Sequence, residues 1–253
     1  MISLETKALI KRKRLFFGDL IVVYSLRERS NLEMDEFEIK RKLVEVSKRL
    51  YNRGLVAGAG GNVSARIPET EEIFITPSGL CKGFLRVEDI LKINLEGKVI
   101  EGKLKPTSET PMHTSIYKTR EDVMAIVHAH PPFCTGFACA RVPLDYRVFP
   151  EIIAMVGEIP LVEYVTPTTE ELAEKVAEYA KKYNALLLAN HGTITLGASL
   201  EQAYQRTELL EDFAKILLVS NILGGPKSLS ESEVKKLRKL ESERYRIRLI
   251  EKL

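Results

Sequence analysis

The stretch Met124-Ala125-Ile126-Val127-His128-Ala129-His130-Pro131 places two histidines at alternate positions directly after a run of apolar residues. A short apolar run that ends near a proline predicts a buried β-strand. Because alternate side chains of a strand project to the same side, both imidazoles can reach one ion. A second apolar run, residues 185–189, leads to His191 and predicts another buried strand that delivers a third imidazole.

The chain has four histidines, and these three predict a divalent metal site. Zinc held by three protein ligands with one open position is the catalytic arrangement. The alternative, histidines that merely face solvent or hydrogen-bond within loops, is disfavoured by the presence of two clusters. Imidazole suits several ions, so manganese and cobalt stay open beside zinc. The fourth histidine, His113, is expected to pack behind the ligands.

Glu109 is the acidic residue that we expect to act with the metal. It precedes a predicted helix that starts near Met112, with Pro111 in the first turn and Thr110 or Ser108 as the cap. A glutamate in this place can simply complement the helix dipole. Beside a metal, however, a carboxylate can accept a proton from a carbon acid while the cation stabilises the enolate.

Three polar turns, each at the end of a predicted element, supply neutral hydrogen-bond donors. The first is the glycine-rich segment 58–66, the second is 76–79 after a short strand, and the third is 105–111. Glycine lets backbone N–H groups approach an anion, and hydroxyl and amide side chains add further donors. Such turns also occur in plain hairpins. Together they are predicted to converge on one phosphate.

Composition limits the classes of function. The chain has 253 residues, 45% hydrophobic content and a net charge of +3, which fits a sizeable core and gives no preference for nucleic acid. No apolar run reaches the roughly 18 residues of a membrane span, and no signal peptide is recognised. The three cysteines fit neither a disulfide framework nor a C-x-x-C ribbon. We therefore expect a cytoplasmic protein with neither a nucleic-acid nor a membrane partner.

Two regions are predicted along the chain. Residues 1–33 are basic and apolar by turns and form an N-terminal extension, either a basic peripheral arm or a product of an upstream start codon. Residues 34–253 form a single domain with a C-terminal helical tail. Its first helix opens at Met34 and stops at 52–54.

The remaining elements predict an α/β or α+β layer with helices on both faces. The predictions are a hairpin that turns at Glu96-Gly97, a proline-started helix from Pro131, a polar turn at 149–155, a strand near 159–162, a helix capped by Thr168 or Thr169, and a last helix over 200–223.

Five ordered motifs resemble the class II aldolase/adducin family, and within it most closely the L-fuculose-1-phosphate aldolases. The resemblance covers roughly residues 34–225. The motifs are Gly-Gly-Asn-Val-Ser at 60–64, Thr-Pro-Ser-Gly at 76–79, Pro-Thr-Ser-Glu at 106–109, His-Ala-His-Pro at 128–131 and Asn-His-Gly at 190–192.

This resemblance implies a three-layer α/β/α fold with a central, mainly antiparallel sheet. It further implies a C4 homotetramer with active sites at subunit interfaces and one zinc ion per subunit. The zinc ligands would be His128, His130 and His191, with Glu109 binding zinc in the empty site and swinging away to act as acid/base. The substrate phosphate would be held by Gly61, Asn62, Ser78, Gly79, Thr107 and Ser108, with Thr107 where a serine is usual.

The implied reaction is reversible cleavage of a ketose 1-phosphate, similar to L-fuculose 1-phosphate, into dihydroxyacetone phosphate and a short aldehyde such as lactaldehyde. A tyrosine is expected to protonate the aldehyde oxygen, but Glu151 stands at the position of one family tyrosine. Tyr245 matches a second family tyrosine near the C-terminus. An exposed tail tyrosine is the alternative reading of Tyr245.

Other outcomes share this scaffold. A methylthioribulose-1-phosphate dehydratase would use a Glu-containing motif near Glu151, whereas a pentulose-phosphate 4-epimerase would carry aspartate where this chain has Glu109. A non-enzymatic, adducin-like interaction domain would be expected to lack the three histidines. The intact histidine set favours an enzyme.

Overall fold

The structure is a computed structural model that describes residues 36–239. The predicted extension at 1–33 and Tyr245 lie outside the described residues. The chain divides into two units, Met1–Ile39 and Lys40–Leu253, and the sheet and the site lie in the second. The helix predicted to open at Met34 is described from residue 36 and runs to residue 52. Gly54 follows with φ 68°, a left-handed conformation that ends the helix as predicted.

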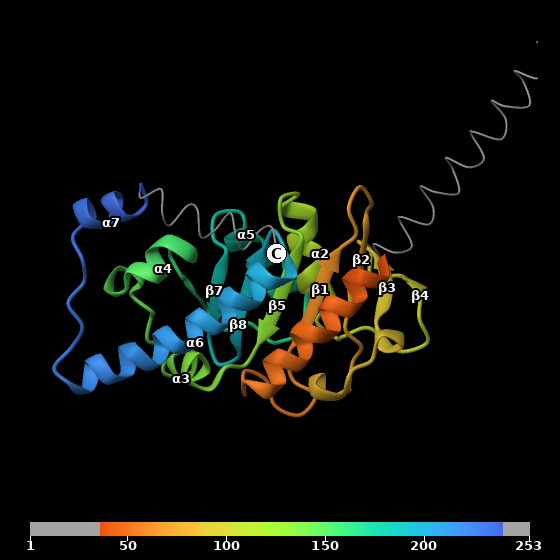
Figure 1. The fold of residues 1–253 in the computed structure, drawn as a ribbon, viewed down its shortest axis with the longest axis horizontal. Coiled ribbons are helices and arrows are strands. Elements are labelled where there is room, and N and C mark those ends of the chain that lie inside the picture. Colours follow the sequence, from red (N-terminus) through yellow and green to blue (C-terminus); the bar gives the residue numbers. More distant parts are fainter. Residues whose placement is uncertain (1–35, 240–253) are drawn as a thin grey trace, which may run out of the picture. The chain divides into compact units, whose positions relative to one another are not determined.

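An eight-stranded sheet forms the centre of the second unit, in the order β4-β3-β2-β1-β5-β8-β7-β6 (Figure 1). Every neighbouring pair is antiparallel except β6 and β7, which are parallel. The strands are β1 Asn62–Arg66, β2 Glu72–Ile75, β3 Leu91–Asn94, β4 Val99–Glu101, β5 Ala125–Ala129, β6 Leu161–Val162, β7 Ala185–Leu188 and β8 Gly192–Gly197.

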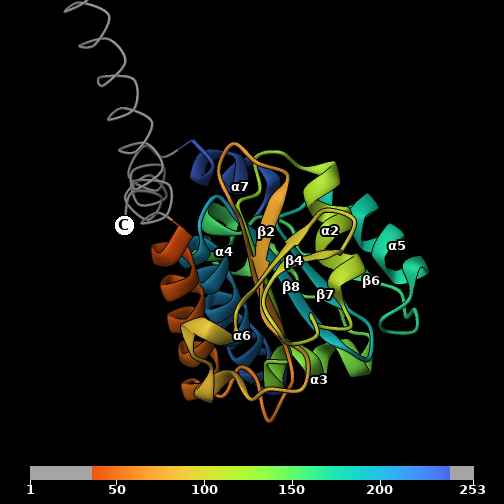
Figure 2. The ribbon, with the colours of Figure 1, turned by 90° about the vertical axis from the view of Figure 1, so that its right-hand side faces the viewer.

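Helices cover both faces of the sheet (Figure 2). On one side lie α2 (Thr110–Thr119) and α5 (Glu170–Ala180), which pack against each other, and on the other side lie α4 (Pro150–Met155) and α6 (Leu200–Ile222). The remaining helices are α3 Pro132–Ala140 and α7 Glu231–Leu237, with short 3₁₀ turns η1 Lys82–Phe84, η2 Val87–Asp89 and η3 Tyr146–Val148.

Strand alternation supplies a core on each face. Leu186 of β7 belongs to the cluster that includes Ile116 of α2 and Val176 of α5. The next residue, Leu187, belongs to the cluster that includes Phe213 of α6. Buried strands that are apolar on both sides require cover on both faces. The predicted three-layer α/β/α fold with a mainly antiparallel sheet is confirmed.

The two strands predicted around the histidines are β5 and β7. β5 lies between β1 and β8, and the β1 register pairs Asn62 with His128. A tight turn joins β7 to β8, with Asn190 in the left-handed conformation at φ 57°. Asparagine adopts that conformation more readily than most residues, because its short polar side chain bonds locally. This turn delivers His191 beside the end of β5.

Several local predictions are confirmed by the structure. The β3–β4 hairpin turns through Glu96 and Gly97. Thr169 caps α5, and its hydroxyl accepts a hydrogen bond from the Leu172 amide at 3.2 Å. The helix predicted over 200–223 is α6, and the strand predicted near 159–162 is β6.

Two local predictions are wrong. Within the predicted polar turn at 149–155, Pro150–Met155 form helix α4, because Ile152 and Ile153 bury one side of it and Pro150 occupies its first turn. The N-cap of α2 is Glu109, without a side-chain capping bond, so neither Thr110 nor Ser108 caps it. The Glu109 carboxylate is instead turned toward other side chains.

None of the helices described between residues 36 and 239 combines the length and apolar character that a membrane crossing requires. Cys81, Cys134 and Cys139 are free thiols, and only Cys134 is buried.

We predict that the central strand contributes more stability than the edge strand. Ile126 of β5 is fully buried, whereas Ile100 of β4 is 50% exposed. Ile126→Ala should lower the free energy of unfolding by about 2–5 kcal/mol, through lost burial and the cavity left behind. The same change at Ile100 should cost less than about 0.5 kcal/mol. Urea denaturation of both variants checks this, and equal losses would contradict the described burial.

Candidate active site

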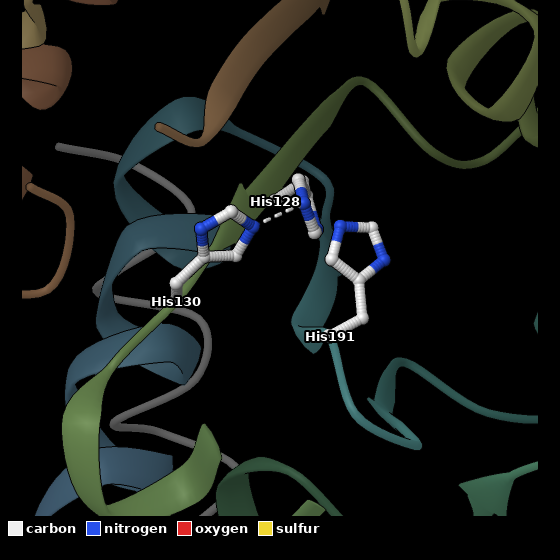
Figure 3. Close-up of side chains that lie close together, drawn as sticks. All are labelled: His128, His130 and His191. Carbon is white, nitrogen blue, oxygen red and sulfur yellow. Dashed lines mark hydrogen bonds between the residues drawn. The ribbon is translucent and has the colours of Figure 1, made fainter. Parts of the chain in front are cut away.

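Three histidine side chains meet where β5 ends and the β7–β8 turn passes it (Figure 3). The ring centroid of His128 lies 4.8 Å from that of His130 and 4.7 Å from that of His191. One nitrogen from each ring lies within 4.8 Å of the others. His128 is fully buried, and the other two are partly exposed. The sequence predicted this convergence from strand alternation at His128 and His130 and from the second apolar run that leads to His191.

Hydrogen bonding determines which nitrogen His128 presents. Its Nδ1 donates to the Thr193 carbonyl at 2.9 Å, and a carbonyl can only accept, so Nδ1 carries the proton. The lone pair is therefore on Nε2. That atom lies 2.9 Å from Nε2 of His130. A backbone carbonyl behind a ring nitrogen is the usual way in which a protein orients a metal-binding imidazole.

The Glu109 carboxylate completes the donor set. Its Oε2 lies 3.1 Å from His128 Nε2, and its Oε1 lies 3.3 Å from His191 Nε2. Glu109 Oε1 is buried without a hydrogen-bond partner. Imidazole and carboxylate lone pairs repel each other unless positive charge lies between them. A divalent cation at this point would satisfy all of them, so the residues fit a metal ion.

The ionisation states agree with this fit. Burial, together with the neighbouring His128, lowers the pKa of His130 and of His191 to about 4. Both imidazoles are therefore neutral at pH 7, which is the form that binds metal. Burial alone would raise the pKa of Glu109, but His128, His191 and the Asn62 amide lower it well below its usual range. Glu109 is therefore a carboxylate.

A chain of buried hydrogen bonds orients Glu109 from behind. The Asn62 side-chain amide donates to Glu109 Oε2 at 2.8 Å, so Asn62 Oδ1 faces His113. His113 Nε2 donates to that oxygen at 2.5 Å, and His113 Nδ1 accepts from the Ser64 hydroxyl at 2.7 Å. Ser64 in turn contacts the Tyr117 hydroxyl at 2.9 Å. His113 thus lies behind the site, as expected, and burial lowers its pKa to about 3.

Two glycines allow the strand ends to approach closely. Gly61 has φ 67°, and a Cβ there would lie 2.6 Å from Val56 Cγ1 and 2.8 Å from the His128 carbonyl oxygen. A Cβ on Gly192 would lie 2.4 Å from the Ala129 carbonyl oxygen. No side chain fits at either distance, so glycine is required both where β1 begins and where β8 begins.

A cavity of about 250 Å³ opens over the histidines, and the three predicted polar turns line it. The predicted phosphate-binding residues therefore lie together, beside Glu109, His130 and His191. The lining residues are Ala59, Gly60, Gly61, Asn62, Pro77, Ser78, Gly79, Lys82, Thr107, Ser108, Glu109, His130, Pro167, Thr168 and His191.

Sequence reasoning did not assign two of these residues with distinctive features, Lys82 and Thr168, to the site. Lys82 is a buried lysine. Its position three residues after the Thr-Pro-Ser-Gly turn could have indicated that a basic side chain lies near the phosphate donors. Thr168 has φ 69°, rare for a non-glycine residue, and it follows Pro167 in a segment far from the other turns in sequence. No local pattern placed that segment at the cavity.

Two residues considered for the aldehyde end do not join this group. Glu151 lies on α4 and is not among the residues that line the cavity. Tyr245 lies outside residues 36–239, so its position is not described. A larger cavity, of about 880 Å³, lies between η3 and α7, but none of its lining residues is a histidine. The smaller cavity is the candidate site because His130, His191 and Glu109 line it.

Comparison with known proteins identifies relatives over most of the chain. The family described as Class II Aldolase and Adducin N-terminal domain matches residues 41–218. An L-fuculose phosphate aldolase of Methanococcus maripaludis is 40% identical over 182 residues, which are 72% of this chain and 97% of the relative. A 5-deoxy-D-ribulose 1-phosphate aldolase of Bacillus thuringiensis is 35% identical, covering 79% of this chain and 93% of the relative.

Solved structures agree with these relatives. An L-fuculose 1-phosphate aldolase structure superposes with a TM-score of 0.76 at 35% identity, covering 80% of this chain and 95% of that chain. Further relatives include 3-oxo-tetronate 4-phosphate decarboxylases. The relatives therefore share a fold and phosphorylated substrates but differ in the bond that is broken.

We predict that the histidine cluster binds one equivalent of divalent metal. His191→Ala should weaken cobalt binding at least about tenfold, because it removes one of three imidazole ligands. Glu174→Gln, an exposed change on α5 away from the cluster, is the control and should retain one equivalent. Titration of metal-free protein with Co²⁺, followed by visible absorption, measures both. Full occupancy in His191→Ala would contradict the assignment.

Proposed function

This chain belongs to the class II aldolase and adducin family, and we propose that it is a metal-dependent aldolase that reversibly cleaves a ketose 1-phosphate. The products would be dihydroxyacetone phosphate and a short aldehyde, with L-fuculose 1-phosphate and lactaldehyde as the first candidates. One observation carries this proposal: His130 and His191 of the histidine cluster, together with Glu109, line the same cavity as the three donor turns. A sugar phosphate could therefore be held at its phosphate and at its reacting oxygens together.

The phosphate end is assigned to the turns. Gly61, Gly79 and Ser108 offer backbone N–H groups around the cavity, and Ser78, Thr107 and Ser108 offer hydroxyls. The Ser78 and Thr107 amides are already bonded to the carbonyls of Lys105 and Thr76. The Thr107 hydroxyl contacts the Glu109 amide at 3.3 Å, which ties this turn to the start of α2. Asn62 lines the cavity, but its amide already donates to Glu109. We therefore assign Asn62 a share in orienting Glu109 as well as the predicted role at the phosphate.

The metal end is assigned to His128, His130 and His191, with one zinc ion per subunit as the proposed occupant. Bound zinc would supply Lewis-acid stabilisation of the enediolate charge. Glu109 moves the proton. In cleavage, the C3–C4 bond breaks, its electron pair remains on C3, and Glu109 delivers to C3 a proton that it has first taken from solvent. In synthesis, Glu109 removes that proton from dihydroxyacetone phosphate. Its contact with Asn62 keeps it ionised for the second role.

The aldehyde end requires a second proton transfer. Cleavage also requires that the C4 hydroxyl lose its proton, and Tyr245 is the residue proposed to exchange that proton. Glu151 occupies the place of the other family tyrosine in sequence and lies on α4. The proposed assembly is a cytoplasmic homotetramer with active sites at subunit interfaces, in which a neighbouring subunit could also contribute to this end.

The rival reactions differ in product. A methylthioribulose-1-phosphate dehydratase would release water, a pentulose-phosphate 4-epimerase would return an isomer, and a decarboxylase such as the relatives named above would release carbon dioxide. An adducin-like interaction domain would turn over nothing. A carboxylate within 3.1–3.3 Å of two histidine nitrogens favours chemistry over a purely structural role.

We predict that Glu109→Gln lowers the rate of cleavage by about 10²–10⁴-fold, the usual contribution of a positioned acid or base. Metal content should remain near that of the wild type, because the three imidazoles are retained. Glu174→Gln, an exposed change on α5, is the matched control and should cleave normally.

Chromatography coupled to mass spectrometry, which separates isomers, measures the products from a panel of ketose 1-phosphates and from 3-oxo-tetronate 4-phosphate, each with and without added zinc. Formation of dihydroxyacetone phosphate only with metal supports the aldolase. Loss of water, isomerisation or loss of carbon dioxide without carbon–carbon aldol cleavage would replace the proposal with the corresponding rival.

A further inference from the structure

Lys82 is a buried cation at the rim of the phosphate turns. It begins η1, three residues after Gly79, and its side chain is only 1% exposed. Its neighbour Gly83 packs so closely on Tyr51 that a Cβ there would lie 2.8 Å from the ring atom Cγ. The backbone that carries Lys82 is therefore held against the helix at 36–52.

The ammonium of Lys82 donates to two backbone carbonyls. Nζ lies 3.1 Å from the Ala59 oxygen and 2.9 Å from the Leu80 oxygen. One carbonyl belongs to the turn that contains Gly61, and the other belongs to the turn that contains Gly79. An ammonium has three N–H donors, so one donor remains for a group in the cavity that Lys82 lines.

The positive charge of Lys82 has no carboxylate partner within residues 36–239. Buried charges are normally paired, because desolvation costs free energy that carbonyl dipoles offset only in part. Burial accordingly lowers the pKa of Lys82. An anion in the cavity would supply the missing opposite charge and favour the charged lysine.

We infer that Lys82 is the cationic ligand of the substrate phosphate and adds a positive charge to the neutral donors of the three turns. The inference rests on the proposed function, since it names a further contact in the same phosphate site. It also explains why a lysine is buried there with no carboxylate partner among residues 36–239. A purely structural lysine, tying two turns together, is the alternative that a test must separate.

Inorganic phosphate is the probe, because its binding requires no carbon chemistry. Full-length wild type, Lys82→Gln and Lys82→Met are titrated with phosphate by calorimetry, and zinc content is measured in parallel. Lys182→Met, an exposed change after α5, is the control. We expect the Kd for phosphate to rise at least about tenfold in both Lys82 variants and to stay within about twofold in Lys182→Met, with zinc content unchanged.

With a ketose 1-phosphate that the enzyme cleaves, kinetics distinguish a lost phosphate contact of Lys82 from a distorted active site. Loss of a phosphate contact should raise KM for the ketose 1-phosphate while kcat stays within about threefold. A distorted site would lower kcat and zinc content together. Folded variants that bind phosphate as the wild type does would overturn the inference. Lysine-dependent phosphate binding without any aldol cleavage would instead retain the inference and remove the proposed aldolase activity.

If the Lys82 variants do not fold, a measurement on the wild-type protein tests the inference instead. The ammonium signals of ¹⁵N-labelled lysines are recorded during phosphate titration, and Lys82 is assigned with Lys82→Arg, which keeps a cation. The Lys82 signal should shift with the same Kd as the calorimetric binding. A Lys82 signal that does not move at saturating phosphate would overturn the inference.

Discussion

The antiparallel pairing of β1, β5 and β8 is the constraint on which the site depends. It places Asn62 opposite His128 and places Thr193 where its carbonyl accepts from His128 Nδ1. The imidazole then presents Nε2 toward Glu109. If the register of β5 shifted by one residue against β1 or β8, the His128 side chain would project from the opposite face of the sheet. Sheet register therefore determines the donor set before any ligand arrives.

The two ends of the cavity favour ligands of opposite charge. At one end, lone pairs of three imidazoles and one carboxylate converge, and a cation would satisfy them. At the other end, an anion would satisfy the backbone amides, the hydroxyls and the proposed Lys82 contact. A phosphorylated sugar with adjacent hydroxyl and carbonyl oxygens matches both requirements. The hydrogen bonds from Tyr117 through His113 to Asn62 keep Glu109 between the two ends.

Much of this arrangement could be predicted from sequence, because local rules decide it. The alternation of His128 and His130, the apolar run before His191 and the glycine turns each follow from periodicity or backbone freedom. The α4 helix was missed because Pro150 and Glu151 suggest a turn, whereas burial of Ile152 and Ile153 favours a helix. Lys82 was missed because its partners are carbonyls of two separate turns, which only the folded chain brings together.

Proton exchange on dihydroxyacetone phosphate tests the central claim most directly, since it isolates the step assigned to Glu109 from the unknown aldehyde. In D₂O, the metal-loaded wild type should replace one of the two C3 protons with deuterium, as followed by proton NMR. Metal-free protein and Glu109→Gln should leave both protons in place. Exchange by Glu109→Gln at the wild-type rate, or none by the metal-loaded wild type, would contradict the account.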